Sequence, residues 1–198
     1  MSAIFQSLPR TLIAGVVLLV IMVVLAGVLS GQPLAMSHAW GAFFMRWLHI
    51  MSGVMWVGLL WYFNFVQIPT VPKIEPAEHR AAITKFIAPN VLFWFRWGAV
   101  ATVATGLLLA AMNNYLVDAL LLRRSSLAIG LGMWMALIMA FNVWFIIWPN
   151  QKKALGLVEA SADEKARAAR IAMLTSRFNT MFSIPMLYFM AAQSHGGL

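Results

Sequence analysis

Leu12-Ile-Ala-Gly-Val-Val-Leu-Leu-Val-Ile-Met-Val-Val-Leu-Ala-Gly-Val-Leu-Ser30 is an uninterrupted apolar run, and it decides the fold class of the chain. A helix of this length crosses a hydrocarbon core about 30 Å thick. Leu127–Trp148 is a second such run, and neither run alternates as a barrel strand does, so we predict membrane-spanning helices. No small-residue cleavage site follows the first run, which we therefore interpret as a retained span rather than a signal peptide.

The composition agrees with a membrane protein. The 198 residues are 62% hydrophobic and only 10% charged, whereas a soluble domain carries about 25% charged residues. We assign the net charge of +8 to basic loops that face anionic membrane lipid, and not to nucleic-acid binding. The chain has no cysteine, which excludes structural disulfides, Cys-ligated iron–sulfur clusters and covalent haem attachment.

We predict an all-α integral membrane protein with five transmembrane helices in a single membrane domain, residues 1–198. The predicted spans are about 11–30, 42–68, 91–112, 127–149 and 178–195. The two most basic loops should carry surface helices that begin at Pro76 and Ser161. Placing these loops in the cytoplasm predicts a multi-pass protein of the bacterial inner membrane, with its N-terminus cytoplasmic and its C-terminus periplasmic.

An internal repeat relates the second span to the fourth. Two pairs of dipeptides recur at the same spacing: Met55-Trp56 with Phe63-Asn64, and Met133-Trp134 with Phe141-Asn142. A proline and then a basic loop follow in both halves, which predicts two related helical hairpins preceded by a leading helix. We expect the two asparagines to hydrogen-bond between helices, with Arg96 as their partner.

His49 is the strongest candidate for a functional residue. It lies inside an apolar span, where ionisable side chains are rare and usually functional. The repeat places Leu127 at the corresponding position, so the symmetry of the fold does not require this histidine. An imidazole here can ligate haem iron or another metal, and the competing interpretation is a histidine that hydrogen-bonds a neighbouring helix.

Two further residues complete the candidate site. Arg46 lies one turn before His49 and could pair with a haem propionate, or it could extend to the outer interface. His195 ends the last span on the same side of the membrane and could be a second axial ligand, although an exposed tail residue is the alternative. We interpret His38 and His79 as surface residues, and the fourteen methionines mainly as packing.

The stretch Arg46-Trp-Leu-His-Ile-Met-Ser-Gly-Val-Met-Trp-Val-Gly-Leu-Leu-Trp-Tyr-Phe-Asn-Phe-Val-Gln-Ile-Pro69 resembles the membrane region of the bacterial membrane-bound urate oxidase (urate hydroxylase) family. Phe95-Arg-Trp-Gly98 and Phe178-Asn-Thr-Met-Phe-Ser-Ile-Pro-Met186 extend the resemblance. The chain is more loosely similar to HemJ-type protoporphyrinogen oxidases and CopD-like membrane proteins. The resemblance to the HemJ type implies a haem-ligating histidine at a position comparable to His49.

The urate oxidase family carries a C-terminal cytochrome c domain, which is not expected in a chain without cysteine. The leading hypothesis is therefore a membrane redox subunit that binds haem b and passes electrons to a separate partner such as a periplasmic cytochrome c. The resemblance implies urate, another small reduced substrate or quinol as electron donor. The alternatives are a non-catalytic anchoring subunit of a larger respiratory complex and a small-molecule transporter. Enzymatic activity stays open, and a homo-oligomer or association with other membrane subunits is compatible with the short chain.

Overall fold

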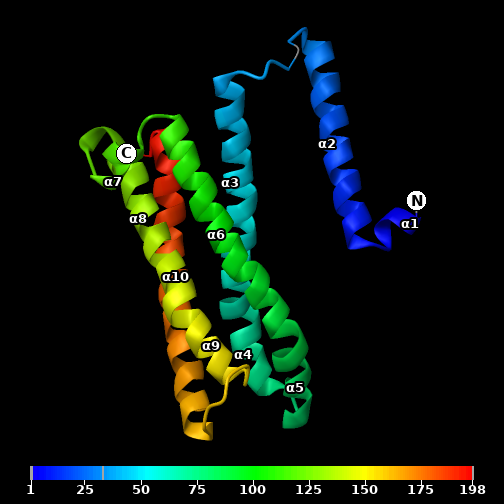
Figure 1. Ribbon diagram of the computed structural model, residues 1–198, viewed down its shortest axis with the longest axis vertical. Coiled ribbons are helices and arrows are strands. Elements are labelled where there is room, and N and C mark those ends of the chain that lie inside the picture. Colours follow the sequence, from blue (N-terminus) through cyan, green and yellow to red (C-terminus); the bar gives the residue numbers. More distant parts are fainter. Residues whose placement is uncertain (1, 33, 198) are drawn as a thin grey trace. The chain divides into compact units, whose positions relative to one another are not determined.

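A computed structural model describes residues 2–32 and 34–197, and every regular element in these ranges is helical (Figure 1). The chain divides into two compact units, residues 1–41 and 42–198. The first unit contains α1 (Ser2–Phe5) and α2 (Leu8–Ser30), and α2 ends at Gly31 in the left-handed conformation. No residue of α2 is buried, and the helix is apolar on all sides, which is consistent with the predicted membrane span.

The second unit consists of two antiparallel helical hairpins, as the repeat predicts (Figure 1). The first hairpin descends through α3 (His38–Trp61), η1 (Tyr62–Gln67), α4 (Ile68–Thr70) and η2 (Val71–Lys73). It returns through η3 (Ala77–His79), α5 (Arg80–Ala82), η4 (Ile83–Ile87) and α6 (Ala88–Met112). The second hairpin comprises η5 (Arg124–Ser126), α8 (Leu127–Phe141), η6 (Asn142–Ile147), α9 (Trp148–Ala154) and α10 (Ala162–His195). Helix α7 (Leu116–Leu120) lies in the connection between the hairpins.

Prolines do not end these helices, contrary to the predicted span limits at residues 68 and 149. The π-helical segments η1, η4 and η6 each end two residues before a proline, namely Pro69, Pro89 and Pro149. A proline cannot donate to the preceding turn, and its ring crowds that turn's carbonyl. Widening the turn before it relieves both problems and lets the helix continue.

Four helical runs are long and apolar enough to cross a membrane: Leu8–Ser30, His38–Lys73, Ala77–Met112 and Arg124–Ala154. The predicted surface helix at Pro76 and the span at 91–112 are thus parts of one continuous helix. The predicted surface helix at Ser161 likewise merges with the span at 178–195 in α10. Because α10 is not among the four runs, the fifth span stays a prediction.

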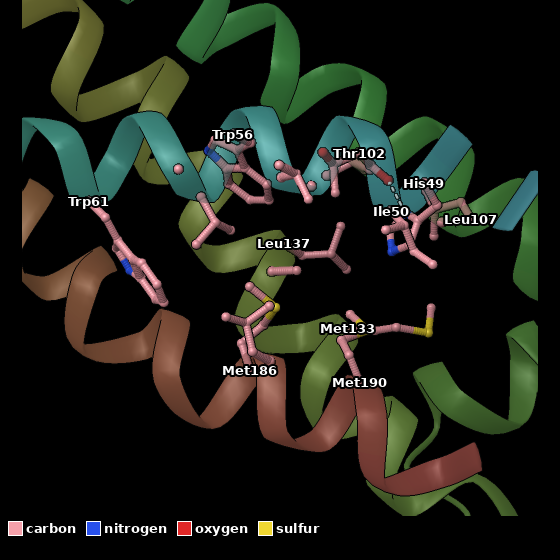
Figure 2. Close-up of a pocket in the computed structure, with 18 residues that line it drawn as sticks. His49, Ile50, Trp56, Trp61, Thr102, Leu107, Met133, Leu137, Met186 and Met190 are labelled. Carbon is pink, nitrogen blue, oxygen red and sulfur yellow. Dashed lines mark hydrogen bonds between the residues drawn. The ribbon is translucent and has the colours of Figure 1, made fainter. Parts of the chain in front are cut away.

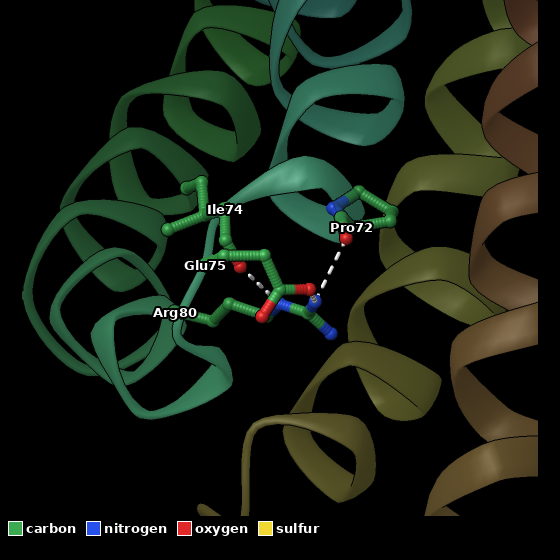
Figure 3. Close-up of polar contacts among 4 residues, drawn as sticks. All are labelled: Pro72, Ile74, Glu75 and Arg80. Atoms are coloured by element: carbon green, nitrogen blue, oxygen red, sulfur yellow. Dashed lines mark hydrogen bonds and ion pairs between the residues drawn. The ribbon is translucent and has the colours of Figure 1, made fainter.

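A single arginine holds the turn of the first hairpin (Figure 3). Arg80 donates from Nε to the carbonyl of Ile74 at 3.0 Å and from Nη2 to that of Pro72 at 2.8 Å. The same Nη2 forms an ion pair with Glu75 at 3.0 Å. Charged donors therefore satisfy carbonyls that the end of a helix leaves without a partner.

The core joins both hairpins. Its largest fully buried side chains include Trp56, Leu60, Phe95, Met139 and Val143. Helices α8 and α10 approach closely at one glycine, since a Cβ at position 132 would lie 3.2 Å from the backbone nitrogen of Met190. Small residues at such contacts let membrane helices pack backbone to backbone.

Candidate functional site

A cavity of about 420 Å³ lies between α3, α6, α8 and α10 of the second unit. Its lining is almost entirely apolar. Figure 2 shows His49 at one end and Trp61 at the other, with Met133, Met186 and Met190 along the facing wall. Pockets of this size and character commonly hold a small molecule or cofactor.

The imidazole of His49 is fixed in one tautomer. Its Nδ1 lies 2.9 Å from the carbonyl oxygen of Thr102 and 3.4 Å from the hydroxyl oxygen of Thr105. A carbonyl can only accept, so Nδ1 carries the proton and donates it. Nε2 then carries the free lone pair, and no partner for it is found among the described residues. In Figure 2 this second ring nitrogen points into the space between α3 and the methionines.

The neighbouring helix leaves room for this ring. A Cβ at Gly106 of α6 would lie 2.7 Å from Cε1 and 3.0 Å from Nδ1 of His49. Real Cβ contacts are not that short, so the ring can occupy its position only because residue 106 lacks a side chain. Nothing in the sequence pattern pointed to this glycine, because it requires knowing which faces of α3 and α6 meet.

Three methionines form the wall opposite His49. Met133 comes from α8, and Met186 and Met190 lie one turn apart on α10. From the sequence we interpret the methionines mainly as packing, and these three are not distinguished there from the others. Their thioethers are soft, weak donors that suit haem iron or copper(I). The spacing of four residues between Met186 and Met190 was the available signal.

The other predicted site residues lie outside the cavity lining. His195 is exposed, and its Nδ1 lies 3.0 Å from the carbonyl of Ala191 in its own helix. Arg46 is also exposed, and its charge acts on Tyr115. Burial raises the pKa of the Tyr115 phenol, and the positive charge of Arg46 partly opposes that shift. The structure therefore brings neither His195 nor Arg46 to the cavity.

The predicted asparagine contacts are confirmed, but the predicted role of Arg96 is wrong. Asn64 donates to the hydroxyl of Ser176 at 2.8 Å, and Asn142 donates to Asn179 at 2.8 Å, so both asparagines tie their helices to α10. The guanidinium of Arg96 lies instead 3.4 Å from the ring centroid of Trp148. The indole ring offers the cation an electrostatic contact that a neutral amide does not.

The cavity can hold a cofactor through one nitrogen donor and a set of thioethers. Among residues 2–32 and 34–197, no group of three or more His, Cys, Asp or Glu is placed to bind a metal ion. A metal site built from three or more residues of these four types is therefore not found in this range. A haem iron needs only axial ligands, and Nε2 of His49 in an apolar cavity fits that requirement.

Comparison with known proteins supports part of the resemblance. Residues 108–197 match the family model of the urate oxidase N-terminal region. Over α7, α8, α9 and α10 the chain is thus similar to that family, as predicted. The stretch from Arg46 to Pro69 lies outside the match, so its resemblance stays a prediction, as does the looser likeness to the HemJ and CopD types. Searches of curated proteins and of solved structures found no match.

Proposed function

We propose that this chain is a membrane redox subunit, related to the N-terminal region of urate oxidase, that binds haem b through His49. One observation carries the proposal: the free Nε2 of His49 faces a cavity whose other walls are mainly thioethers, hydrocarbon and the indole rings of Trp56 and Trp61. Haem bound there would supply one-electron transfer.

The chain's own residues prepare the ligand. The carbonyl of Thr102 accepts the proton of Nδ1, which fixes the ring orientation and makes Nε2 more basic. Gly106 provides the space for the ring. The apolar lining keeps water out and lowers the local dielectric, which tunes the reduction potential of a bound haem.

The second axial ligand is proposed on the same grounds. A thioether from Met133, Met186 or Met190 lines the cavity, whereas His195 does not. His195 could take this role only if the end of α10 moved. Arg46 lies one turn before His49 on α3 and is the cation available for a propionate at that end of the helix.

Orientation and partners complete the proposal. The turn at Arg80 and the connection from α9 to α10 lie at one end of the second unit (Figure 1). Residues 73–85 and 152–170, which include this turn and the helix ends on both sides of this connection, hold eight of the thirteen lysines and arginines of the unit. Placing that end in the cytoplasm puts His49 toward the periplasmic side of the inner membrane. A periplasmic cytochrome c could then accept electrons, with urate, another small reduced substrate or quinol as the donor.

The test is a reduced-minus-oxidised absorption spectrum of the detergent-purified protein. Wild type should give a b-type signal, and His49→Ala should lose it and regain it with added imidazole. His79→Ala is the control, because His79 is exposed in the turn. Haem binding would be refuted if wild-type protein, titrated with haemin and then freed of unbound haemin, showed no b-type spectrum. Co-purification of stoichiometric partners without a cofactor would then favour the anchoring subunit.

A further inference from the structure

Arg96 is a positively charged residue for which the described structure shows no negatively charged partner. It lies on α6, and its guanidinium carbon is 3.4 Å from the ring centroid of Trp148 and 5.9 Å from that of Trp144. The structure describes an ion pair of Arg80 with Glu75 and another of Arg123 with Asp118. Neither involves Arg96.

Two of its donors lack partners. Nε and Nη1 of Arg96 are buried, and no acceptor for either is found among the described residues. A buried donor without a partner is costly, and a charged one more so. An acceptor from outside the chain is therefore expected at this position.

A second cation shares the same aromatic ring. Nζ of Lys152, on α9, lies 5.7 Å from the ring centroid of Trp148. Lys152 is half-buried and takes part in neither of the two ion pairs of the described chain. Two positive charges near one ring repel each other, and an anion close to both would offset this repulsion.

The depth of the site points to the headgroup region. Trp97 packs edge-on against Trp144 at 5.7 Å between ring centroids, and half of its surface is exposed. Exposed tryptophans are enriched where the hydrocarbon meets the polar headgroups. The acceptor available at that depth, with charge opposite to arginine and lysine, is phosphate.

We propose that Arg96, Trp148 and Lys152 form a phosphate-binding site that takes the headgroup of an anionic phospholipid. The arginine presents in-plane donors to the phosphate oxygens, the lysine adds a second positive charge, and the tryptophan ring holds both cations in place. Helix α9, which carries Trp148 and Lys152, lies at the same end of the second unit as α5 (Figure 1). The helices at this end are rich in lysine and arginine, so anionic lipid would gather there.

The experiment measures binding of phosphatidylglycerol to the delipidated protein in a neutral detergent, with phosphatidylcholine as the uncharged comparison. Bound lipid is quantified after gel filtration. Arg96→Gln and Lys152→Gln should each weaken phosphatidylglycerol binding by about fivefold, the effect of one cation at a membrane surface. Arg96→Lys should recover only part of the loss, since it restores charge but not the planar donors.

Lys153→Gln is the matched control. It removes the same charge from the adjacent residue, which is exposed and makes no contact with the tryptophan ring in the structure. If Lys152→Gln and Lys153→Gln weakened phosphatidylglycerol binding equally, the effect would come from the overall positive charge, and the proposed site would be wrong. Equal binding of the two lipids by wild type would do the same.

A competition arm separates the two sources of phosphate. Inorganic phosphate that displaces phosphatidylglycerol at equal phosphate concentration would assign the site to free phosphate. Retention of the lipid would assign it to the headgroup, as proposed, and either result supports a phosphate site. The haem spectrum is independent of this measurement, so failure of one proposal leaves the other intact.

Discussion

The side-chain amide of Asn142 donates a 2.8 Å hydrogen bond to the side-chain oxygen of Asn179. Asn179 in turn donates to the carbonyl oxygen of Met139 at 3.0 Å, one turn before the π-helical segment η6. Both asparagines are buried. Helix α10 is therefore fastened to the point where the second hairpin changes its helical geometry.

Replacing Asn179 with leucine should lower the free energy of unfolding by about 1–2 kcal/mol, because the amide of Asn142 loses its acceptor. Thermal unfolding in detergent would measure it. Adding Asn142→Leu should restore part of the loss, since no polar group then stays unpaired. Asn150→Leu is the control, because Asn150 bonds only the carbonyl of Ile146 in its own helix. An equal loss in the control would contradict the interhelical role.

Substituting Gly106 with alanine should displace the imidazole of His49 and cost about 1–3 kcal/mol of stability through overpacking. If the proposed haem site is correct, haem affinity should fall as well. Gly58→Ala is a close control, because Gly58 lines the same cavity and a Cβ there would meet nothing within 4 Å. Haemin titration of both variants gives the comparison. The site would be misplaced if the two variants bound haemin equally well.

The sequence predicted those features that depend on a single helix and not on its neighbours. Apolar length predicted the helices. The depth of His49 and the absence of a repeat counterpart made it a candidate, and the structure places it in the lining of the cavity. The predicted ends of the second and fourth spans, next to Pro69 and at Pro149, were wrong, because proline normally interrupts the hydrogen bonds of a helix. The π-helical turns that accommodate these prolines have no simple pattern of residue types.

The asparagines were expected to bond between helices, but the helix that each one meets could not be read from the sequence. A 3.6-residue period gives the faces of a helix but not which neighbour each face meets. For this reason Arg96 was assigned to asparagines although it lies on Trp148, and the methionine wall opposite His49 was not foreseen. Gly106 became meaningful only when the ring beside it was known.

The start of α10 should loosen in acid. Ser161 and Glu164 form a reciprocal capping pair, in which the Glu164 carboxylate accepts from the backbone nitrogen of Ser161 at 2.8 Å. The hydrogen bonds from the backbone and side chain of Ser161 lower the pKa of Glu164 below its usual 4.5. A lowered pKa means that the stabilisation is complete above the unfolded value and is lost as the pH falls through the folded one.

The protection factors of the amides in the first turn of α10, which are the exchange rates of an unfolded chain at the same pH divided by the measured rates, should therefore fall below about pH 4.5 in the wild type. Glu164→Gln should abolish this pH dependence, because the amide oxygen still accepts but does not titrate. Asp163→Asn removes a charge from the same turn without touching the cap, and it should behave like the wild type. Persistent acid sensitivity in Glu164→Gln would place the titrating group elsewhere.

Arg80→Gln should open the turn of the first hairpin, since it removes charged hydrogen bonds to the carbonyls of Ile74 and Pro72. We expect faster proteolysis between residues 72 and 80 and a loss of about 1–3 kcal/mol. Glu75→Gln should have a much smaller effect, because the glutamate is 75% exposed and the ion pair is worth little at a surface. Comparable damage from both variants would assign the turn's order to the ion pair instead of the carbonyls.

Substitutions can distinguish the three cavity methionines from His195 as candidates for the second axial ligand of a bound haem. Replacing Met133, Met186 or Met190 with leucine preserves volume and removes the sulfur, so each variant should fold with a cost below about 1.5 kcal/mol. If one of them ligates haem iron, that variant alone should lower the midpoint potential and change the reduced spectrum, because a thioether ligand raises the potential. His195→Ala should leave both unchanged, since His195 does not line the cavity. The reverse pattern, in which His195→Ala alone alters the spectrum, would require the end of α10 to fold over the cavity when haem binds.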